Sequence, residues 1–149
     1  MFESFPSSSP VWIYAADRFL TDDELAFVHG SMTEFLKAWN THGKELTADF
    51  EIVERTFIVV AANEMLVKAS GCSIDSLVHC IKTLGKELAI DFFNRLSLLA
   101  ERNGEFKRVH FSELSSFLDW NIFNTSVNRL DTFQQEFKVK VSESNLVRI

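Results

Sequence analysis

Leu46-Thr-Ala-Asp-Phe-Glu-Ile-Val-Glu-Arg-Thr-Phe-Ile-Val-Val-Ala-Ala62 is the stretch from which the fold class of this chain follows. Its first part, Leu46 to Ile52, alternates apolar and polar residues, which is typical of a strand with one solvated face. Its second part, Thr56 to Ala62, is apolar almost throughout and predicts a central, buried strand. The two strands are expected to meet around Glu54-Arg55.

A helix is predicted on each side of this strand pair. On the N-terminal side, Thr21-Asp-Asp-Glu24 is a capping box that opens a run of apolar residues at helical spacing. This helix is expected to end at His42-Gly43. On the C-terminal side, a second helix is predicted from about Ser73 to Ala89. Its buried stripe is expected to consist of Ile74, Leu77, Val78, Ile81, Leu84 and Leu88.

Two further segments complete the pattern. Val11 to Tyr14 is a short β-rich run that predicts the first strand. Leu96 to Glu101 and Glu105 to Phe111 flank Asn103-Gly104, a strong signal for a β-hairpin. The order strand–helix–strand–strand–helix–strand predicts an α+β fold, specifically a ferredoxin-like βαββαβ sandwich.

The ends of the chain lie outside that sandwich. Residues 1–10 are expected to be a flexible arm, and residues 11–149 a single α+β domain. Residues 105–149 would form a C-terminal extension packed on the sandwich. Its predicted elements after the hairpin strand are a short helix over Ser112–Asp119, a strand over Asn121–Val127 and a last helix over Asn128–Phe137.

Composition excludes several classes of function. The 149 residues are 46% hydrophobic and 24% charged, as in an ordinary globular protein. The net charge of -6, without a Lys/Arg cluster, opposes binding to nucleic acid. The longest apolar run, Phe57 to Ala62, is too short to span a membrane, and the N-terminus lacks the pattern of a signal peptide. With only two cysteines, we expect a soluble cytoplasmic protein.

Four motifs carry a resemblance to a known family: Trp39-x-x-His42-Gly43, Phe50-Glu51-Ile52, Ser70-Gly-Cys-Ser-Ile-Asp75 and Ile90-Asp-Phe-Phe-Asn-Arg95. Together they resemble a small family of bacteroidete proteins of about this length, over most of the chain. Members of that family often carry the label "ABC transporter ATPase". The function of the family is uncharacterised, and the label can be tested against the residues.

The residues do not support the ATPase label. A P-loop requires G-x-x-x-x-G-K-[ST], because successive backbone N–H groups must converge on the phosphates. Gly43-Lys44 and Gly85-Lys86 are the only Gly-Lys pairs in the chain. Both lack the glycine five residues earlier and the Ser or Thr that must follow. The chain is therefore not expected to be an ATPase by itself.

Ser70-Gly71-Cys72-Ser73-Ile74-Asp75 is the strongest candidate for a binding site. With Ser73 as the N-cap of the second helix, Cys72 would lie beside unpaired N–H groups that favour a thiolate. This predicts a nucleophilic or redox-sensing thiol. The structural alternative makes Cys72 a small apolar plug against Leu77, in the manner of a hydrophobic staple. Asp75 is explained by the helix dipole, and no general base is identified.

Cys72, His79 and Cys80 are not expected to share a metal ion. Along the helix axis, His79 would lie about 10 Å and Cys80 about 12 Å beyond Cys72. A metal ion needs ligands within roughly 2.0–2.3 Å, and a disulfide also needs closer Cα atoms. We therefore predict no metal, no cofactor and no intramolecular disulfide.

Four other polar residues are weaker candidates: His42, Glu51, Asp91 and Arg95. His42 beside Gly43 is predicted to be a turn residue. A His42–Cys72 dyad is not expected, since the predicted topology puts the two segments at opposite ends of the sheet. The other three indicate surface charge, with Asp91 and Arg95 as a local ion pair of little net stability, or else a polar binding patch.

The leading hypothesis is a module that binds a small ligand or a protein partner without catalysis. It rests on a complete core that has no nucleotide loop, metal set or catalytic constellation. Two alternatives stay open. One is a thiol-dependent enzyme or redox sensor centred on Cys72, and the other is a homodimer assembled through an exposed sheet edge.

Overall fold

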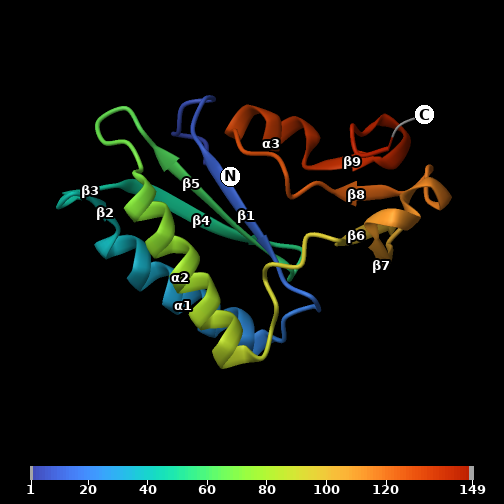
Figure 1. Cartoon of the computed structure of the whole chain (residues 1–149), viewed down its shortest axis with the longest axis horizontal. Helices are drawn as coiled ribbons and strands as arrows, with labels where there is room; N and C mark the ends of the chain where they lie inside the picture. Colours follow the sequence, from blue (N-terminus) through green and yellow to red (C-terminus); the bar gives the residue numbers. More distant parts are fainter. Residues whose placement is uncertain (1, 148–149) are drawn as a thin grey trace.

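A computed structural model describes residues 2–147 and contains a three-stranded antiparallel sheet in the order β1-β5-β4 (Figure 1). The strands are β1 (Val11–Ala15), β5 (Phe57–Asn63) and β4 (Thr47–Val53). β5 is the central strand and is buried except at Asn63, as its apolar sequence predicted. Glu54, Arg55 and Thr56 join β4 to β5, and Glu54 and Arg55 have φ of 52° and 51°. The Thr56 N–H donates to the Val53 carbonyl oxygen at 3.1 Å, and positive φ at both central residues of such a turn is typical of type I′.

Two antiparallel helices, α1 (Asp22–Ala38) and α2 (Gly71–Leu88), cover one face of this sheet (Figure 1). The capping box at the start of α1 is confirmed. In the predicted stripe of α2, Leu77, Ile81 and Leu84 are buried, whereas Ile74, Val78 and Leu88 are half-buried. A hydrogen bond connects the two helices, or the residues flanking them, at each end of the pair. Arg18 Nη2 donates to the carbonyl oxygen of Leu88 at 3.1 Å, and Trp39 Nε1 donates to that of Ser73 at 2.7 Å. The end of α1 therefore lies beside the start of α2.

A second sheet of four strands has the order β7-β6-β8-β9. Its strands are β6 (Ser97–Arg102), β7 (Glu105–His110), β8 (Asn121–Phe123) and β9 (Lys138–Lys140). The predicted hairpin between β6 and β7 is confirmed, and Asn103 and Gly104 both have positive φ at its turn.

The α+β class is confirmed, but the ferredoxin-like arrangement is not. A ferredoxin-like sandwich would place β6 beside β1, whereas β6 pairs with β7 and β8 in the second sheet. The cause is the apolar character of both faces of β6. Leu98 and Ala100 pack into a cluster around Trp120, while Leu99 packs toward the first sheet. The C-terminal third of the chain thus has a core of its own, which draws β6 away from β1.

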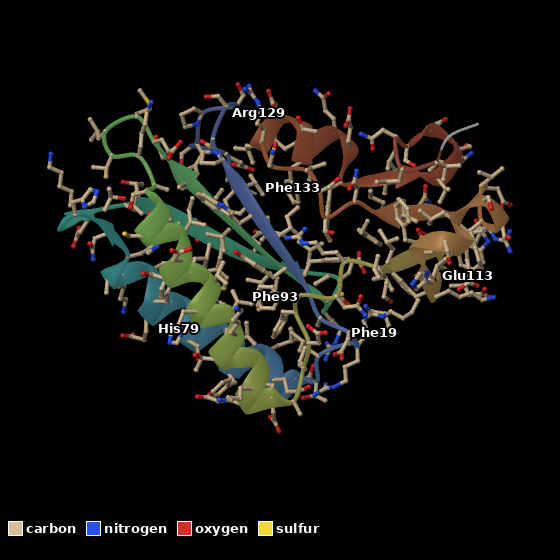
Figure 2. The ribbon with its side chains drawn as sticks, viewed as in Figure 1. Phe19, His79, Phe93, Glu113, Arg129 and Phe133 are labelled. Atoms are coloured by element: carbon tan, nitrogen blue, oxygen red, sulfur yellow. The ribbon has the colours of Figure 1, made fainter. Side chains whose placement is uncertain are left out.

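The other face of the first sheet is covered by α3 (Leu130–Glu136) and part of the second sheet. Phe133, labelled in Figure 2, is among the buried residues of this layer. The ring of Phe57 on β5 lies 5.2 Å from that of Phe123 and 5.1 Å from that of Phe137. These aromatic contacts join the two halves of the protein.

The C-terminal elements are shorter than expected. A 3-10 helix over Phe111–Ser116 replaces the predicted helix over Ser112–Asp119. The strand predicted over Asn121–Val127 ends at Phe123, because the Asn124 carboxamide accepts the Ser126 N–H in a tight turn. The last helix begins at Leu130, and the tail after it forms β9 and a 3-10 helix over Val141–Glu143.

Residues 2–10, expected as part of a flexible arm, have well-defined contacts. The side chain of Phe2 is buried in the layer beneath α3. The N–H groups of Leu130 and Asp131 donate to the carbonyl oxygens of Ser9 and Ser7, at 2.9 and 3.0 Å. These bonds satisfy two amides at the start of α3, so the segment acts as a backbone cap for that helix.

Candidate functional site

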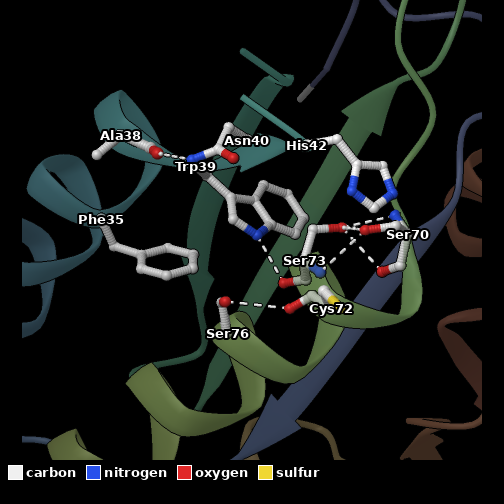
Figure 3. A pocket seen from close by; sticks show the side chains of 9 residues that line it. All are labelled: Phe35, Ala38, Trp39, Asn40, His42, Ser70, Cys72, Ser73 and Ser76. Atoms are coloured by element: carbon white, nitrogen blue, oxygen red, sulfur yellow. Dashed lines mark hydrogen bonds between the residues drawn. The ribbon is translucent and has the colours of Figure 1, made fainter. Parts of the chain in front are cut away.

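A cavity of about 290 Å³ opens where α1 ends and α2 begins (Figure 3). Its walls come from two segments that are about thirty residues apart in sequence. Apolar side chains form one side and polar side chains the other. The lining residues are Phe35, Ala38, Trp39, Asn40, His42, Ser70, Cys72, Ser73 and Ser76.

The start of α2 is built by two serines three residues apart. Ser70 Oγ accepts the N–H of Ser73 at 3.2 Å, and Ser73 Oγ accepts the N–H of Ser70 at 2.6 Å. This reciprocal capping box makes Ser70 the N-cap, so the prediction of Ser73 as N-cap is wrong. Ser73 is buried and its polar atoms are all engaged, which assigns it a structural role.

Trp39 fixes the end of α1 against the start of α2. Besides the hydrogen bond to Ser73, its ring lies 5.8 Å from that of Phe35 and 5.7 Å from that of Trp12. The buried indole thereby forms a rigid wall of the cavity, with its N–H already satisfied.

His42 reaches the cavity from a short hairpin. β2 (Asn40–Thr41) and β3 (Lys44–Glu45) are joined by His42 and Gly43, with φ of 51° and 83°. These angles are those of a type I′ turn, so α1 ends at Ala38 rather than at His42-Gly43. Figure 3 shows the His42 ring over the first turn of α2, beside Ser70.

His42 and Cys72 therefore line the same cavity, and the expectation that they lie at opposite ends of the sheet is wrong. The physical reason is the antiparallel packing of α1 and α2, which places the end of one beside the start of the other. No hydrogen bond joins the His42 ring to the Cys72 thiol within the described part of the chain.

Cys72 is exposed at the second position of α2. The plug against Leu77 is therefore not formed, and Leu77 is buried without it. Cys80, eight residues further along the same helix, is half-buried, and this burial raises the pKa of its thiol. Both cysteines are free thiols with different surroundings.

The remaining candidates are not brought to this cavity. Gly71 and Asp75 belong to the first turns of α2 without lining it, and Glu51 is exposed on β4. Asp91 accepts the N–H of Phe93 at 2.8 Å. It forms no ion pair with Arg95 among the described residues. Arg95 instead lies near Tyr14, where its charge lowers the Tyr14 pKa against a larger upward shift from burial.

The lining suits a small molecule with an apolar body and a hydrogen-bonding group. Phe35, Ala38 and Trp39 offer apolar contacts. The amide of Asn40 and the hydroxyl of Ser76 offer polar groups, and no Asp or Glu belongs to the lining. The N-terminus of α2 adds a positive dipole end on the same side.

Sequence reasoning missed Phe35, Ala38, Asn40 and Ser76 as part of this site. Trp39 and His42 do occur together in one sequence motif, as do Ser70 and Cys72 in another. The signal that was available is the pairing of those two motifs at the adjacent ends of antiparallel helices.

Comparison with known proteins adds no assignment: no protein-family model, curated protein or solved structure matches the chain. Within residues 2–147, none of the helices is both long and apolar enough to cross a membrane. The same residues contain no cluster of three His, Cys, Asp or Glu side chains placed to hold a metal ion.

Proposed function

We propose that the protein is a non-catalytic binding module that holds a small molecule in the cavity between α1 and α2. The observation that carries the proposal is the convergence of residues 39–42 and 70–76 on one concave site. Small-molecule sites are typically concave, mostly apolar and equipped with a few convergent polar groups. The cavity has all three properties, at a volume suited to a small ligand.

The ligand class follows from the lining. An aromatic or aliphatic body would pack against Trp39 and Phe35, and a carboxylate or amide would face Asn40 and the start of α2. A cationic group is disfavoured, because no carboxylate lines the cavity and the positive end of the α2 dipole points toward it. We therefore propose small carboxylic acids or their amides as ligands.

A titration followed by NMR tests this proposal. Phenylacetate, phenylacetamide and a panel of similar small acids and amides are added to ¹⁵N-labelled protein. We expect shifts confined to residues 35–42 and 70–76, with the Trp39 indole N–H as a direct reporter. The indole N–H of Trp120 serves as an internal reference, since this residue does not line the cavity and packs in a different cluster.

A pair of matched variants makes the test specific. Ser76 and Thr83 lie on α2, are exposed, and each donates a side-chain hydrogen bond to the carbonyl oxygen four residues earlier. Ser76→Phe would fill the cavity and is expected to abolish the shifts, whereas Thr83→Phe should leave them. If no compound in the panel shifts these resonances, or if Ser76→Phe binds as the native chain does, the proposal fails.

A second candidate function is thiol chemistry at Cys72, favoured by the presence of His42 in the same cavity. A nearby histidine can act as the base that a cysteine nucleophile requires. The exposure of Cys72 would allow a reactant to reach it. This candidate requires that His42 change the reactivity of the thiol.

Alkylation by iodoacetamide, followed by peptide mass spectrometry, is expected to modify Cys72 several-fold faster than Cys80. Burial of Cys80 limits access and raises its pKa, so less of it is thiolate at a given pH. If His42 assists, His42→Gln will shift the pH profile of Cys72 alkylation, since the variant lacks the imidazole that would accept the thiol proton. His79→Gln, exposed on the same helix, is the control. A profile that His42→Gln leaves unchanged would eliminate thiol catalysis.

A further inference from the structure

One edge of the first sheet, along β1, carries unpaired backbone groups. The N–H of Ala16 donates to the carbonyl oxygen of Thr56, and that of Ala62 donates to the carbonyl oxygen of Pro10. The backbone N–H and C=O groups of the even-numbered residues of this segment therefore point toward β5. Because the direction of the backbone hydrogen-bonding groups alternates along a strand, the N–H and C=O groups of Val11, Ile13 and Ala15 point away from β5, toward the open edge. The Val11 N–H meets the Asn128 carbonyl oxygen at 3.0 Å. Among the described residues, the N–H groups of Ile13 and Ala15 have no such partner.

A cavity of about 270 Å³ adjoins this edge. It is lined by residues 11–14 of β1, by residues 125–128 and by Arg95. The bond between Val11 and Asn128 closes one end, where the two backbone segments meet. Phe93, labelled in Figure 2, precedes Arg95 in the segment that leads from α2 to β6, and its ring packs 5.6 Å from that of Tyr14. No strand of the described chain pairs with the outer edge of β1, which β6 would occupy in a ferredoxin-like sandwich.

Arg95 gives this edge a positive charge. No Asp or Glu lines the cavity, and Arg95 forms no ion pair among the described residues. The phenol of Tyr14, which interacts electrostatically with Arg95, is itself largely buried. An entering carboxylate would therefore meet an unneutralised guanidinium, which binds carboxylates with two parallel hydrogen bonds.

The opposite edge of the sheet, along β4, is protected. There the Asp49 carboxylate accepts the N–H of Phe50 at 2.8 Å, which covers one outward amide. Glu51 adds a second acidic side chain on the same strand. Charged residues on an edge strand are a common means of preventing strand addition. The β1 edge has no equivalent carboxylate, so the two edges differ in their capacity to accept another strand.

We propose that the β1 edge binds an extended peptide segment of a partner protein, which adds to the sheet beside β1 and places a carboxylate against Arg95. Backbone bonds to Ile13 and Ala15 would supply affinity, as in other cases of β-strand addition. These two residues are about 7 Å apart along the strand, so about three residues of the peptide would span them. The segment from Thr125 to Asn128 confines the site on its far side, which favours a single strand over a second copy of this chain.

Hydrogen exchange of the Ile13 and Ala15 amides, measured by NMR, tests the proposal. The probes are acetylated five-residue peptides of alternating threonine and valine. One carries a glutamate side chain with an amidated C-terminus, one a free C-terminal carboxylate, and one no carboxylate. We expect at least about tenfold slower exchange of both amides with a carboxylate peptide, and a weaker effect with the neutral one. Comparison of the first two identifies the source of the carboxylate.

Edge prolines provide a matched pair of variants. Ala15→Pro removes an outward N–H of β1, and Ala48→Pro removes an outward N–H of β4, at positions where an edge strand tolerates proline. We expect Ala15→Pro to abolish peptide binding and Ala48→Pro to retain it, with thermal unfolding used to verify that both variants fold. Arg95→Gln, which leaves the backbone unchanged, should weaken binding of the carboxylate peptides to that of the neutral one.

Three results would overturn the proposal. The first is unchanged exchange of Ile13 and Ala15 with all three peptides. The second is equal binding by the native chain and Arg95→Gln. The third is protection of both amides in the absence of peptide together with a dimer in light scattering, which would assign the edge to a second copy. None of these results bears on ligand binding between α1 and α2, because the two cavities share no lining residue.

Discussion

Replacing Phe57 by alanine is expected to lower the free energy of unfolding by about 3–5 kcal/mol. The side chain is 1% exposed and packs against Phe123 and Phe137, so it connects β5 to the C-terminal layer. Its removal would leave a cavity between two rigid layers and would delete two aromatic contacts. Since a domain of this size is stable by only about 5–15 kcal/mol, the loss would be a large fraction of the total.

Urea unfolding monitored by circular dichroism measures this effect, with Phe27→Ala as the control. Phe27 is 43% exposed on α1, and alanine is a better helix former, so its replacement should change the stability by less than about 0.5 kcal/mol. Similar losses in the two variants, or a loss below about 1 kcal/mol for Phe57→Ala, would contradict the assigned role of Phe57.

Gly85→Ala is expected to destabilise the protein by about 1–3 kcal/mol, although alanine normally favours a helix. A Cβ atom at Gly85 would lie 2.5 Å from the backbone carbonyl oxygen of Ile90. This approach arises because Ala89 takes a left-handed conformation, with φ of 55°, which folds the chain back so that the Ile90 N–H donates to the Gly85 oxygen at 2.9 Å. The clash involves backbone on both sides and cannot be relieved by a rotamer change.

Gly30→Ala is the matched control, because both glycines lie inside helices. A Cβ atom at Gly30 would have no neighbour within 4 Å. Its replacement should therefore raise the free energy of unfolding by up to about 1 kcal/mol. The two substitutions are expected to have opposite signs in the same denaturation experiment, and equal signs would show that the chain does not pass beneath Gly85 as described.

The cavity between α1 and α2 shows which parts of a site can be predicted from sequence. The motif around Ser70 and Cys72 was recognisable, because capping residues and a helix start are encoded within a few positions. Its boundary was displaced by three residues, since Ser70 and Ser73 can each act as a cap and the reciprocal bond decides between them. His42 was recognised as a turn residue and a candidate, but its place beside Cys72 was not, because a His-Gly pair is compatible with both a helix end and a type I′ turn.

Local structure in this chain follows from local sequence. The capping box of α1, the apolar stripe of α2 and the buried strand β5 are specified by residues that act within one element, through hydrogen-bond capping and hydrophobic periodicity. The pairing of β6, in contrast, is not specified by its own sequence. Its apolar sequence alone does not distinguish a position beside β1 from one between β7 and β8. In the structure, Leu98 and Ala100 of β6 belong to the cluster around Trp120, which includes Val141 and other residues distant in sequence. The same long-range packing brings His42 to Cys72 and leaves the β1 edge open, because both depend on how whole elements meet rather than on the pattern within any one of them.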